Sequence, residues 1–195
     1  MEKVEEEITQ KLSSKGLLSS QLLFYDLTNF FTYIATTNTK SELAQRGRNK
    51  QKRHDLRQFG LMQVATREFL IPVLSQVYEG NKSDKELFIS ALTRIRKKFA
   101  ELNLELEEFT IVFDKGSNSQ NNFKELDQAK LPYVASLSAT YQKDLLAIPL
   151  SDYEWVTVNG KDCPCYRTRK KIWGKKRTIV ITLSEKLGQG ELRGL

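Results

Sequence analysis

The stretch LLFYDLTNFF at residues 22–31 decides the fold, and FTIVFDKG at residues 109–116 is its counterpart. Both are apolar and rich in aromatic or β-branched residues, which is typical of buried strands. Each also carries an acid where one is disfavoured, because Asp26 lies inside the first stretch and Asp114 ends the second. A carboxylate in such a strand needs a cation, a hydrogen-bond network or a metal to offset its desolvation.

The residues between and after these stretches predict alternating strands and helices. FGLMQVAT (59–66) and FLIPVLSQVYEG (69–80) are expected to form a hairpin connected by residues 66–68, with Pro72 indicating that the second strand lies at an edge or has a bulged start. Ser83 and Glu86 have capping-box spacing at the start of an amphipathic helix. A short helix over 120–129 and a strand over 131–138 follow. This order predicts an α/β fold with a mixed sheet.

Three regions are expected along the chain. Residues 1–19 hold an acidic, helix-prone segment with apolar residues spaced four apart, which predicts a docking helix. Residues 20–146 contain the α/β pattern of a core. Residues 147–195 change to short strand-like pieces with turns at Asn159-Gly160 and near Gly174, which predicts a small β-rich addition.

Composition excludes several classes of protein. The chain has 195 residues, with one histidine and two cysteines, too few for a structural zinc cage. No apolar run is long enough for a membrane span, and the acidic N-terminus is unlike a secretory signal. We therefore expect no membrane partner and a reducing, cytoplasmic setting. If the chain is an enzyme, carboxylates and a hard metal are the remaining candidates.

The positive charge is concentrated in two short segments. Residues 46–57 hold six Lys or Arg and one Asp, a net charge of +5, and residues 161–177 hold eight and one, a net charge of +7. The whole chain carries only +7. Such segregation is typical of a polyanion-binding surface, although two solvated basic loops would give the same pattern.

The two aspartates predict a metal site if their strands are neighbours. Neighbouring strands lie about 4.8 Å apart, so both carboxylates could then reach one divalent ion. Such an ion can activate a water or a hydroxyl for attack on a phosphodiester. The alternative is structural: Asp26 caps a turn and Asp114 merely ends a strand.

Four motifs in order resemble DDE-type transposases of bacterial insertion sequences, closest to the group with a β-rich insertion in the catalytic domain. The motifs are Y-D-x-T-x-F from residue 25, R-G-x-x-K-x-x-R from 46, E-G-N-x-x-D from 79 and F-D-K-G-x-x-S-x-x-N-F from 113. The similarity runs from about residue 20 to about residue 185. It implies a ribonuclease-H-like mixed sheet with flanking helices, a small β-rich insertion at the C-terminal end, and two-metal phosphoryl transfer on DNA.

The resemblance also implies roles for particular residues. Asp26 and Asp114 match the family's first and second catalytic, metal-binding aspartates, with Mg²⁺ as the cofactor and Mn²⁺ as a substitute. The partners implied are double-stranded DNA, as element ends and target, and further copies of the chain on that DNA, in a bacterial cytoplasm. The residues expected to contact the DNA backbone are Arg46, Arg48, Lys50, Lys52 and Arg53.

Asn81 and Asp84 lie where a strand, a loop and a helix are expected to meet. A side chain there can cap the helix or approach the metal site, and capping is the expected role.

One part of the family pattern is missing. The third metal ligand is a glutamate in a pattern like Y-x-x-R-x-x-x-E, and neither Glu185 nor Glu191 has the required Tyr and Arg before it. We therefore expect a C-terminally truncated fragment that binds DNA without cleaving or joining it at a useful rate. The alternatives are a non-catalytic DNA-binding remnant and a ribonuclease-H-like nuclease that hydrolyses without joining.

Overall fold

The computed structural model describes residues 2–18, 22–35, 37–49, 52–138 and 142–183. Lys50, Glu185 and Glu191 therefore lie outside the described residues. The chain divides into two units, Met1–Leu137 and Ser138–Leu195, whereas the sequence predicted a boundary at 146/147. Each unit is described by itself.

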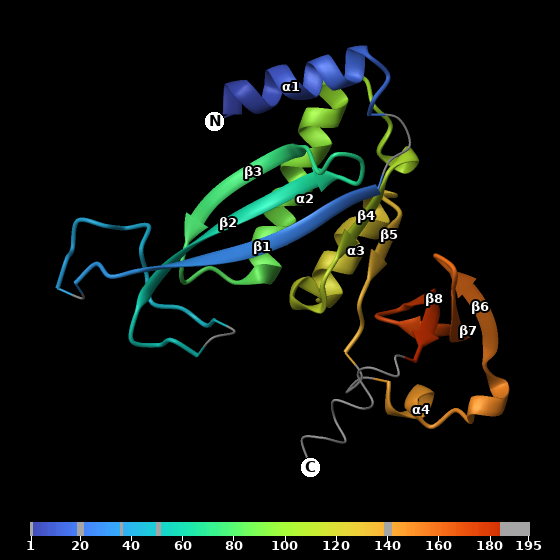
Figure 1. Ribbon diagram of the computed structural model, residues 1–195. Helices are drawn as coiled ribbons and strands as arrows, with labels where there is room; N and C mark the ends of the chain where they lie inside the picture. Colours follow the sequence, from blue (N-terminus) through green and yellow to red (C-terminus); the bar gives the residue numbers. More distant parts are fainter. Residues whose placement is uncertain (1, 19–21, 36, 50–51, 139–141, 184–195) are drawn as a thin grey trace. The chain divides into compact units, whose positions relative to one another are not determined.

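The first unit is built on a five-stranded mixed sheet (Figure 1). β1 pairs antiparallel with β2 and parallel with β4, β2 pairs antiparallel with β3, and β4 pairs parallel with β5. This arrangement confirms the predicted α/β class and has the strand order and directions of a ribonuclease-H-like sheet. Across the sheet, the strands are β3 (Pro72–Glu79), β2 (Arg57–Thr66), β1 (Leu22–Thr32), β4 (Thr110–Phe113) and β5 (Tyr133–Ala135).

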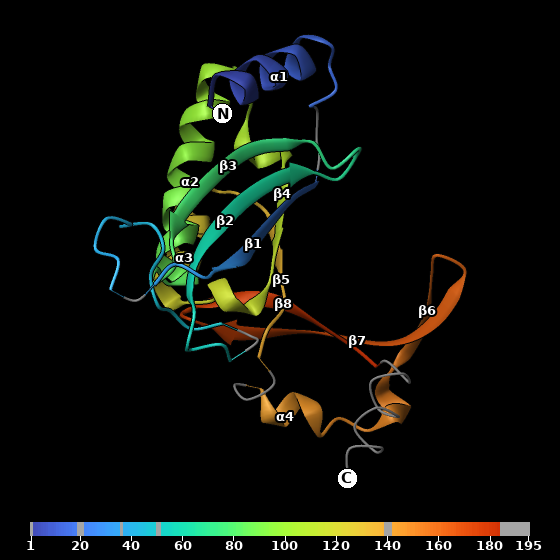
Figure 2. The same ribbon diagram turned by 60° about the vertical axis from the view of Figure 1, so that its left-hand side comes forward.

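Helices α2 (Asp84–Glu101) and α3 (Gln120–Gln128) cover one face of this sheet (Figures 1 and 2). The predicted capping box is confirmed, because the Ser83 hydroxyl accepts the Glu86 N–H and the Glu86 carboxylate accepts the Ser83 N–H. Ser119 caps α3 in the same way, through the backbone N–H of residue 122. Both helix starts were therefore predictable from local sequence.

Phe88 of α2 lies at the centre of an aromatic core. Its ring lies 5.1 Å from that of Tyr25 on β1 and 4.5 Å from that of Phe113 on β4, measured between centroids. Phe123 of α3 extends the cluster, 6.0 Å from Phe113. Edge-to-face and tilted ring pairs of this kind add to the free energy gained by burial. The helix therefore holds together the two strands that carry the aspartates.

The hairpin between β2 and β3 differs from the prediction. β3 begins at Pro72, because Phe69 and Leu70 have φ of +62° and +50° and form a turn. The Thr66 hydroxyl donates to the Glu68 carbonyl and accepts the N–H of residue 71, which closes this turn. Apolar character alone suggested that the strand starts at residue 69, and the hydroxyl-closed turn takes its place. The edge position predicted from Pro72 is confirmed.

Helix α1 (Glu2–Ser14) protects the outer edge of β3. The buried carboxylate of Glu5 on α1 accepts the Ser75 N–H at 3.2 Å. From α2, the Lys98 ammonium donates to the Val73 carbonyl at 2.6 Å. Burial lowers the pKa of Lys98, and the nearby charges of Glu5 and Glu6 oppose that shift. Two side chains thus satisfy main-chain groups that a further strand would otherwise pair with.

The second unit is a three-stranded antiparallel sheet in the order β6-β7-β8. Asn159 and Gly160, with φ of +51° and +73°, form the predicted turn between β6 and β7. The bounds are β6 (Glu154–Val158), β7 (Lys161–Ile172) and β8 (Lys175–Thr182), preceded by α4 (Lys143–Leu146) and the 3₁₀ turn Leu150–Asp152. The first unit contains two further 3₁₀ turns, η1 (Leu106–Glu108) and η2 (Lys115–Ser117). None of the described helices combines the length and apolarity needed to cross a membrane.

The edge contact of Glu5 yields a stability prediction. Glu5→Ala leaves the buried Ser75 N–H without its acceptor and should lower the free energy of unfolding by about 1–3 kcal/mol, measured by urea titration. Glu7→Ala removes an exposed glutamate from the same helix and should change it by less than about 0.5 kcal/mol. Equal losses in the two variants would contradict the role of Glu5 at the β3 edge.

Candidate functional site

Asp26 and Asp114 occupy matching positions on neighbouring strands. β1 and β4 pair in parallel from Leu22 opposite Thr110 to Phe24 opposite Val112. Asp26 and Asp114 each follow the last paired residues by two positions, and Asp114 comes directly after the end of β4. Neighbouring strands lie about 4.8 Å apart, so the register, if it continued past β4, would set the two aspartates at a distance that one divalent ion can bridge.

The two aspartates lie on the face of the sheet away from α2. Tyr25 and Phe113, which immediately precede them, are 5% and 4% exposed and contact Phe88. Because side chains alternate along a strand, the following residues point to the opposite face. Asp26 and Asp114 are both exposed there. Both carboxylates are therefore open to solvent.

Asp114 is held at the end of β4 by its neighbours. One carboxylate oxygen, Oδ1, accepts the Lys115 N–H and the Ser136 hydroxyl, each at 2.7 Å. The Ser136 carbonyl accepts the side-chain amide of Asn118 at 2.8 Å. Ser136 directly follows β5, so the strand neighbouring β4 orients Asp114. Sequence reasoning did not identify Ser136, because its role depends on the β4–β5 pairing.

The structural alternative was that Asp26 caps a turn and Asp114 merely ends a strand. Asp114 does follow the last residue of β4, and it also caps the 3₁₀ turn η2 through the N–H of residue 115. Asp26 caps no turn, because it lies in the middle of β1, opposite Gln63 of β2. Asp26 is exposed, so the desolvation expected of a carboxylate in this strand does not arise.

Hydrogen bonds of Asn122 connect the loop after Asp114 to helices α2 and α3. Buried Asn122 of α3 donates to the Ser117 carbonyl at 2.7 Å and to the Lys85 carbonyl of α2 at 3.1 Å. The motif that begins at Phe113 therefore includes the residues that set the position of this loop.

Asp84 contacts the same loop from the α2 side. It is the first residue of α2, and a Cβ at Gly116 would lie 2.5 Å from its carboxylate Oδ2. Capping by Asn81 or Asp84 was the expected role and is wrong, because Ser83 is the N-cap. Asn81 lies exposed in the turn before the helix. Asp84 instead lies beside the residue two positions after Asp114.

The pKa values of two tyrosines are raised in part by the negative charges of Asp84 and Asp26. Burial raises the pKa of Tyr78 to about 12, and the charges of Asp84 and Asp26 act in the same direction. Burial and Asp84 also raise the pKa of Tyr25. The Tyr78 hydroxyl donates to the Asn29 amide oxygen at 3.1 Å, passing over Gly60, where a Cβ would overlap the ring.

The described residues contain no group of three or more His, Cys, Asp or Glu side chains able to hold a metal ion. Asp26, Asp84 and Asp114 therefore do not form one cluster of that kind. The carboxylate oxygens of Asp26 and Asp114 and the Ser136 hydroxyl are ligand types that Mg²⁺ and Mn²⁺ favour.

The basic segment is attached to the end of β3 by a backbone contact between two glycines. A Cβ on Gly47 would overlap the Gly80 carbonyl, and one on Gly80 would overlap the Gln58 carbonyl. The buried Gln58 amide donates to the carbonyls of Gly80 and Arg48, at 2.8 and 3.2 Å. The glycines of two of the quoted motifs therefore meet in space. This contact places the basic segment where β3 ends and β2 begins.

The predicted DNA-contacting residues differ in their surroundings. Arg46, Arg48 and Lys52 are exposed, and Lys50 lies outside the described residues. Arg53 forms an ion pair with Asp55 at 2.8 Å, and its hydrogen bond lowers the pKa of Asp55 to about 2. Part of the charge of Arg53 is thus already balanced.

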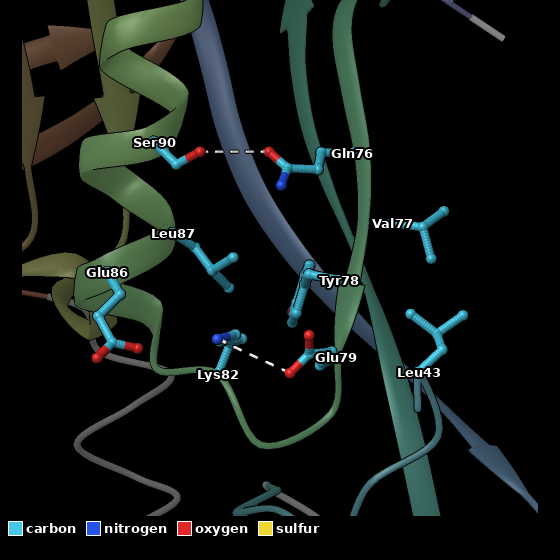
Figure 3. A pocket seen from close by; sticks show the side chains of 9 residues that line it. All are labelled: Leu43, Gln76, Val77, Tyr78, Glu79, Lys82, Glu86, Leu87 and Ser90. Atoms are coloured by element: carbon cyan, nitrogen blue, oxygen red, sulfur yellow. Dashed lines mark hydrogen bonds and ion pairs between the residues drawn. The ribbon is translucent and has the colours of Figure 1, made fainter. Parts of the chain in front are cut away.

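A pocket of about 430 Å³ lies along β3 (Figure 3). Leu87 and Ser90 of α2 line one side and Leu43 the other, with Lys82 and Glu79 paired at 3.8 Å near its end. Neither Asp26 nor Asp114 lines it. Both aspartates lie on the exposed surface instead.

Comparisons with known proteins find remote structural likenesses. No family model matches the sequence, and a search of curated proteins finds no match. The Mos1 transposase paired-end complex with left transposon end is 10% identical over 72% of this chain and 42% of its own, with a TM-score of 0.40. A pre-cleavage Mos1 transpososome is 12% identical over 77% and 45%, with a TM-score of 0.38. The Mos1 mariner paired-end complex with Mn is 12% identical over 73% and 43%, also at 0.38. This chain spans less than half the length of each.

The charge near Tyr78 yields a pH prediction. Asp84→Asn should lower the pKa of Tyr78 from about 12 part of the way towards 10, because one negative neighbour is lost while burial remains. Absorbance titration, with Tyr78→Phe identifying the signal, measures the change. Because folding raises the pKa of Tyr78, the protonated hydroxyl stabilises the fold fully below pH 10. This contribution to stability is lost as the pH rises through about 12. An unchanged value would place Asp84 away from Tyr78.

The glycine contact yields a second prediction. Gly80→Ala should lower the free energy of unfolding by at least about 1–3 kcal/mol, because its Cβ meets the backbone of residue 58. Gly116→Ala is the matched control, since its Cβ meets only the end of the Asp84 side chain, which can rotate away. Urea titration should give a distinctly smaller loss for the control. The reverse order would contradict the fixed attachment of the basic segment.

Proposed function

We propose that this chain is part of a DDE-type transposase of a bacterial insertion sequence. The complete enzyme would cleave DNA at the element ends and join the exposed 3′ hydroxyl to target DNA, acting as a homo-oligomer on that DNA. One observation carries the proposal: β1 pairs in parallel with β4, Asp26 lies on β1, Asp114 directly follows β4, and both aspartates are exposed. The four motifs of the sequence support the same family.

Asp26 and Asp114 would hold the divalent ion, Mg²⁺ or Mn²⁺. Carboxylate oxygens suit these hard cations, and the exposed face admits a DNA strand. When bound, the metal supplies positive charge that activates a water or hydroxyl and offsets charge on the phosphodiester. The Ser136 hydroxyl and the Lys115 N–H keep Asp114 oriented for this role. Asp84 would position the loop that follows Asp114.

The basic segment would hold the DNA backbone beside the aspartates. β1 and β3 both end where β2 begins, and Gly47 is in contact with this end of the sheet, whereas Asp26 lies further along β1, opposite Gln63. Arg46 and Arg48 flank that glycine and are exposed. Contacts to phosphate position DNA without reading its sequence, so this binding would be sensitive to salt.

Two carboxylates are one ligand short of the family's set of three. The proposal assigns the third glutamate to a position outside the described residues. With the pair alone, we expect weak binding of one divalent ion and binding of DNA without useful cleavage or joining.

The aspartate pair is tested by metal binding. Titration of the metal-free protein with Mn²⁺, followed by electron paramagnetic resonance, should show a weak site. Asp26→Asn and Asp114→Asn should each weaken it by at least about tenfold. Asp152→Asn, which removes an exposed aspartate from the other unit, should leave it unchanged. Equal Mn²⁺ affinity in all variants would contradict the site.

An assay with supercoiled plasmid and Mn²⁺ separates the alternatives. Cleavage with strand joining by the 195-residue chain would contradict the fragment proposal. Cleavage without joining, abolished by Asp26→Asn, would favour a ribonuclease-H-like nuclease. DNA binding with no Mn²⁺ site would favour a non-catalytic remnant.

A further inference from the structure

The second basic segment has its cations sorted onto two faces of a sheet. Residues 161–177 form β7 and the start of β8, whose side chains alternate between the faces. Arg167, Arg169 and Lys171 are alternate residues of β7, so they share one face, and all are exposed. Lys176 of β8 pairs directly with Lys171 and joins them. These four residues are called the cationic face.

On the opposite face, two cations form hydrogen bonds within the second unit. Lys170 donates to both carboxylate oxygens of Asp144, each at 2.6 Å. Arg177 is buried at 9% exposure and donates from Nε to the Ile172 carbonyl at 3.2 Å. By contrast, no residue of the cationic face has an ion pair with a described residue. Contacts within the unit therefore account for Lys170 and Arg177 on the opposite face, but not for the cations of the cationic face.

The cationic face carries an electrostatic cost. Lys171 and Lys176 lie directly opposite each other across two strands, where like charges are destabilising. Arg169 adds a third positive charge two residues along β7. A polyanion bound on this face would offset the repulsion, because each contact replaces a like-charge neighbour with an opposite charge.

We propose that the cationic face binds the phosphate backbone of double-stranded DNA, at a site separate from residues 46–53. The inference rests on the proposed function for its partner. Alternate residues of a strand are about 6.8 Å apart, so the β7 row spans about 13.6 Å, the rise of about four nucleotides. Arg167 and Arg169 pair across the strands with Val180 and Thr178, so the neighbours of the two guanidinium groups are small. A continuous row of phosphates fits this arrangement.

Two matched double variants test the face. Lys171→Gln with Lys176→Gln removes two cations from the cationic face, and Lys170→Gln with Lys175→Gln removes the adjacent two from the opposite face. Binding of a 30-base-pair fluorescent duplex is measured by anisotropy across a KCl series in EDTA. The first variant should reduce the slope of log K against log[KCl] by about 1.8, at about 0.9 per phosphate contact. The second should reduce it by less than about half as much.

The outcomes separate this inference from the proposed function. Equal slope changes in the two double variants would overturn the face assignment. A slope change only in Arg46→Gln with Arg48→Gln would overturn it too, while leaving the proposed function intact. Absence of duplex binding by the unaltered chain at 50 mM KCl would overturn both. Displacement of the duplex by equimolar polyglutamate would show a general site for acidic chains and overturn the assignment to a DNA backbone.

A Lys176→Glu variant serves as a control that separates a loss of DNA binding from a loss of stability. It places a carboxylate opposite Lys171, so the melting temperature should rise while duplex affinity falls by at least tenfold. A variant that is less stable and also binds less would contradict the trade-off between repulsion and binding.

Discussion

The packing of Phe88 between Tyr25 and Phe113 is the contact on which the candidate site depends. Each of these two partners immediately precedes one of the aspartates. A slip of one residue in either strand would move the aromatic ring to solvent and the carboxylate into the core, at a large cost in free energy. The hydrophobic core beneath the sheet thereby keeps both carboxylates on the exposed side.

The loops around the pair are held by short polar contacts rather than by apolar packing. Ser136 orients Asp114 from the end of β5, and Asn122 ties the following loop to α2. On the other side, Gln58 and the two glycines bind the basic segment to β3. Asp114 and the basic segment therefore lie in loops that are held in place by the sheet, whereas Asp26 lies within β1.

Much of the fold was predictable from local sequence. Apolar strands, the capping box of Ser83 and the misplaced acids Asp26 and Asp114 are patterns within a few residues of one another. The features that were missed depend on distant partners. Gly47 and Gly80 lie 33 residues apart in sequence, so nothing local indicates their contact. The separation of Lys170 from Lys171 required the register of β7 and β8, because a run of adjacent cations does not show which side chains face a neighbour.

The two outer edges of the five-stranded sheet limit how copies of this chain can associate. At one edge, Glu5 and Lys98 already bind the main-chain groups of β3 that a strand from another molecule would need. At the other edge, β5 is three residues long and gives only a short ladder. Assembly by extending the sheet from molecule to molecule is therefore disfavoured at both ends. Copies of this chain would therefore have to meet through faces or loops, and each would keep a sheet of its own.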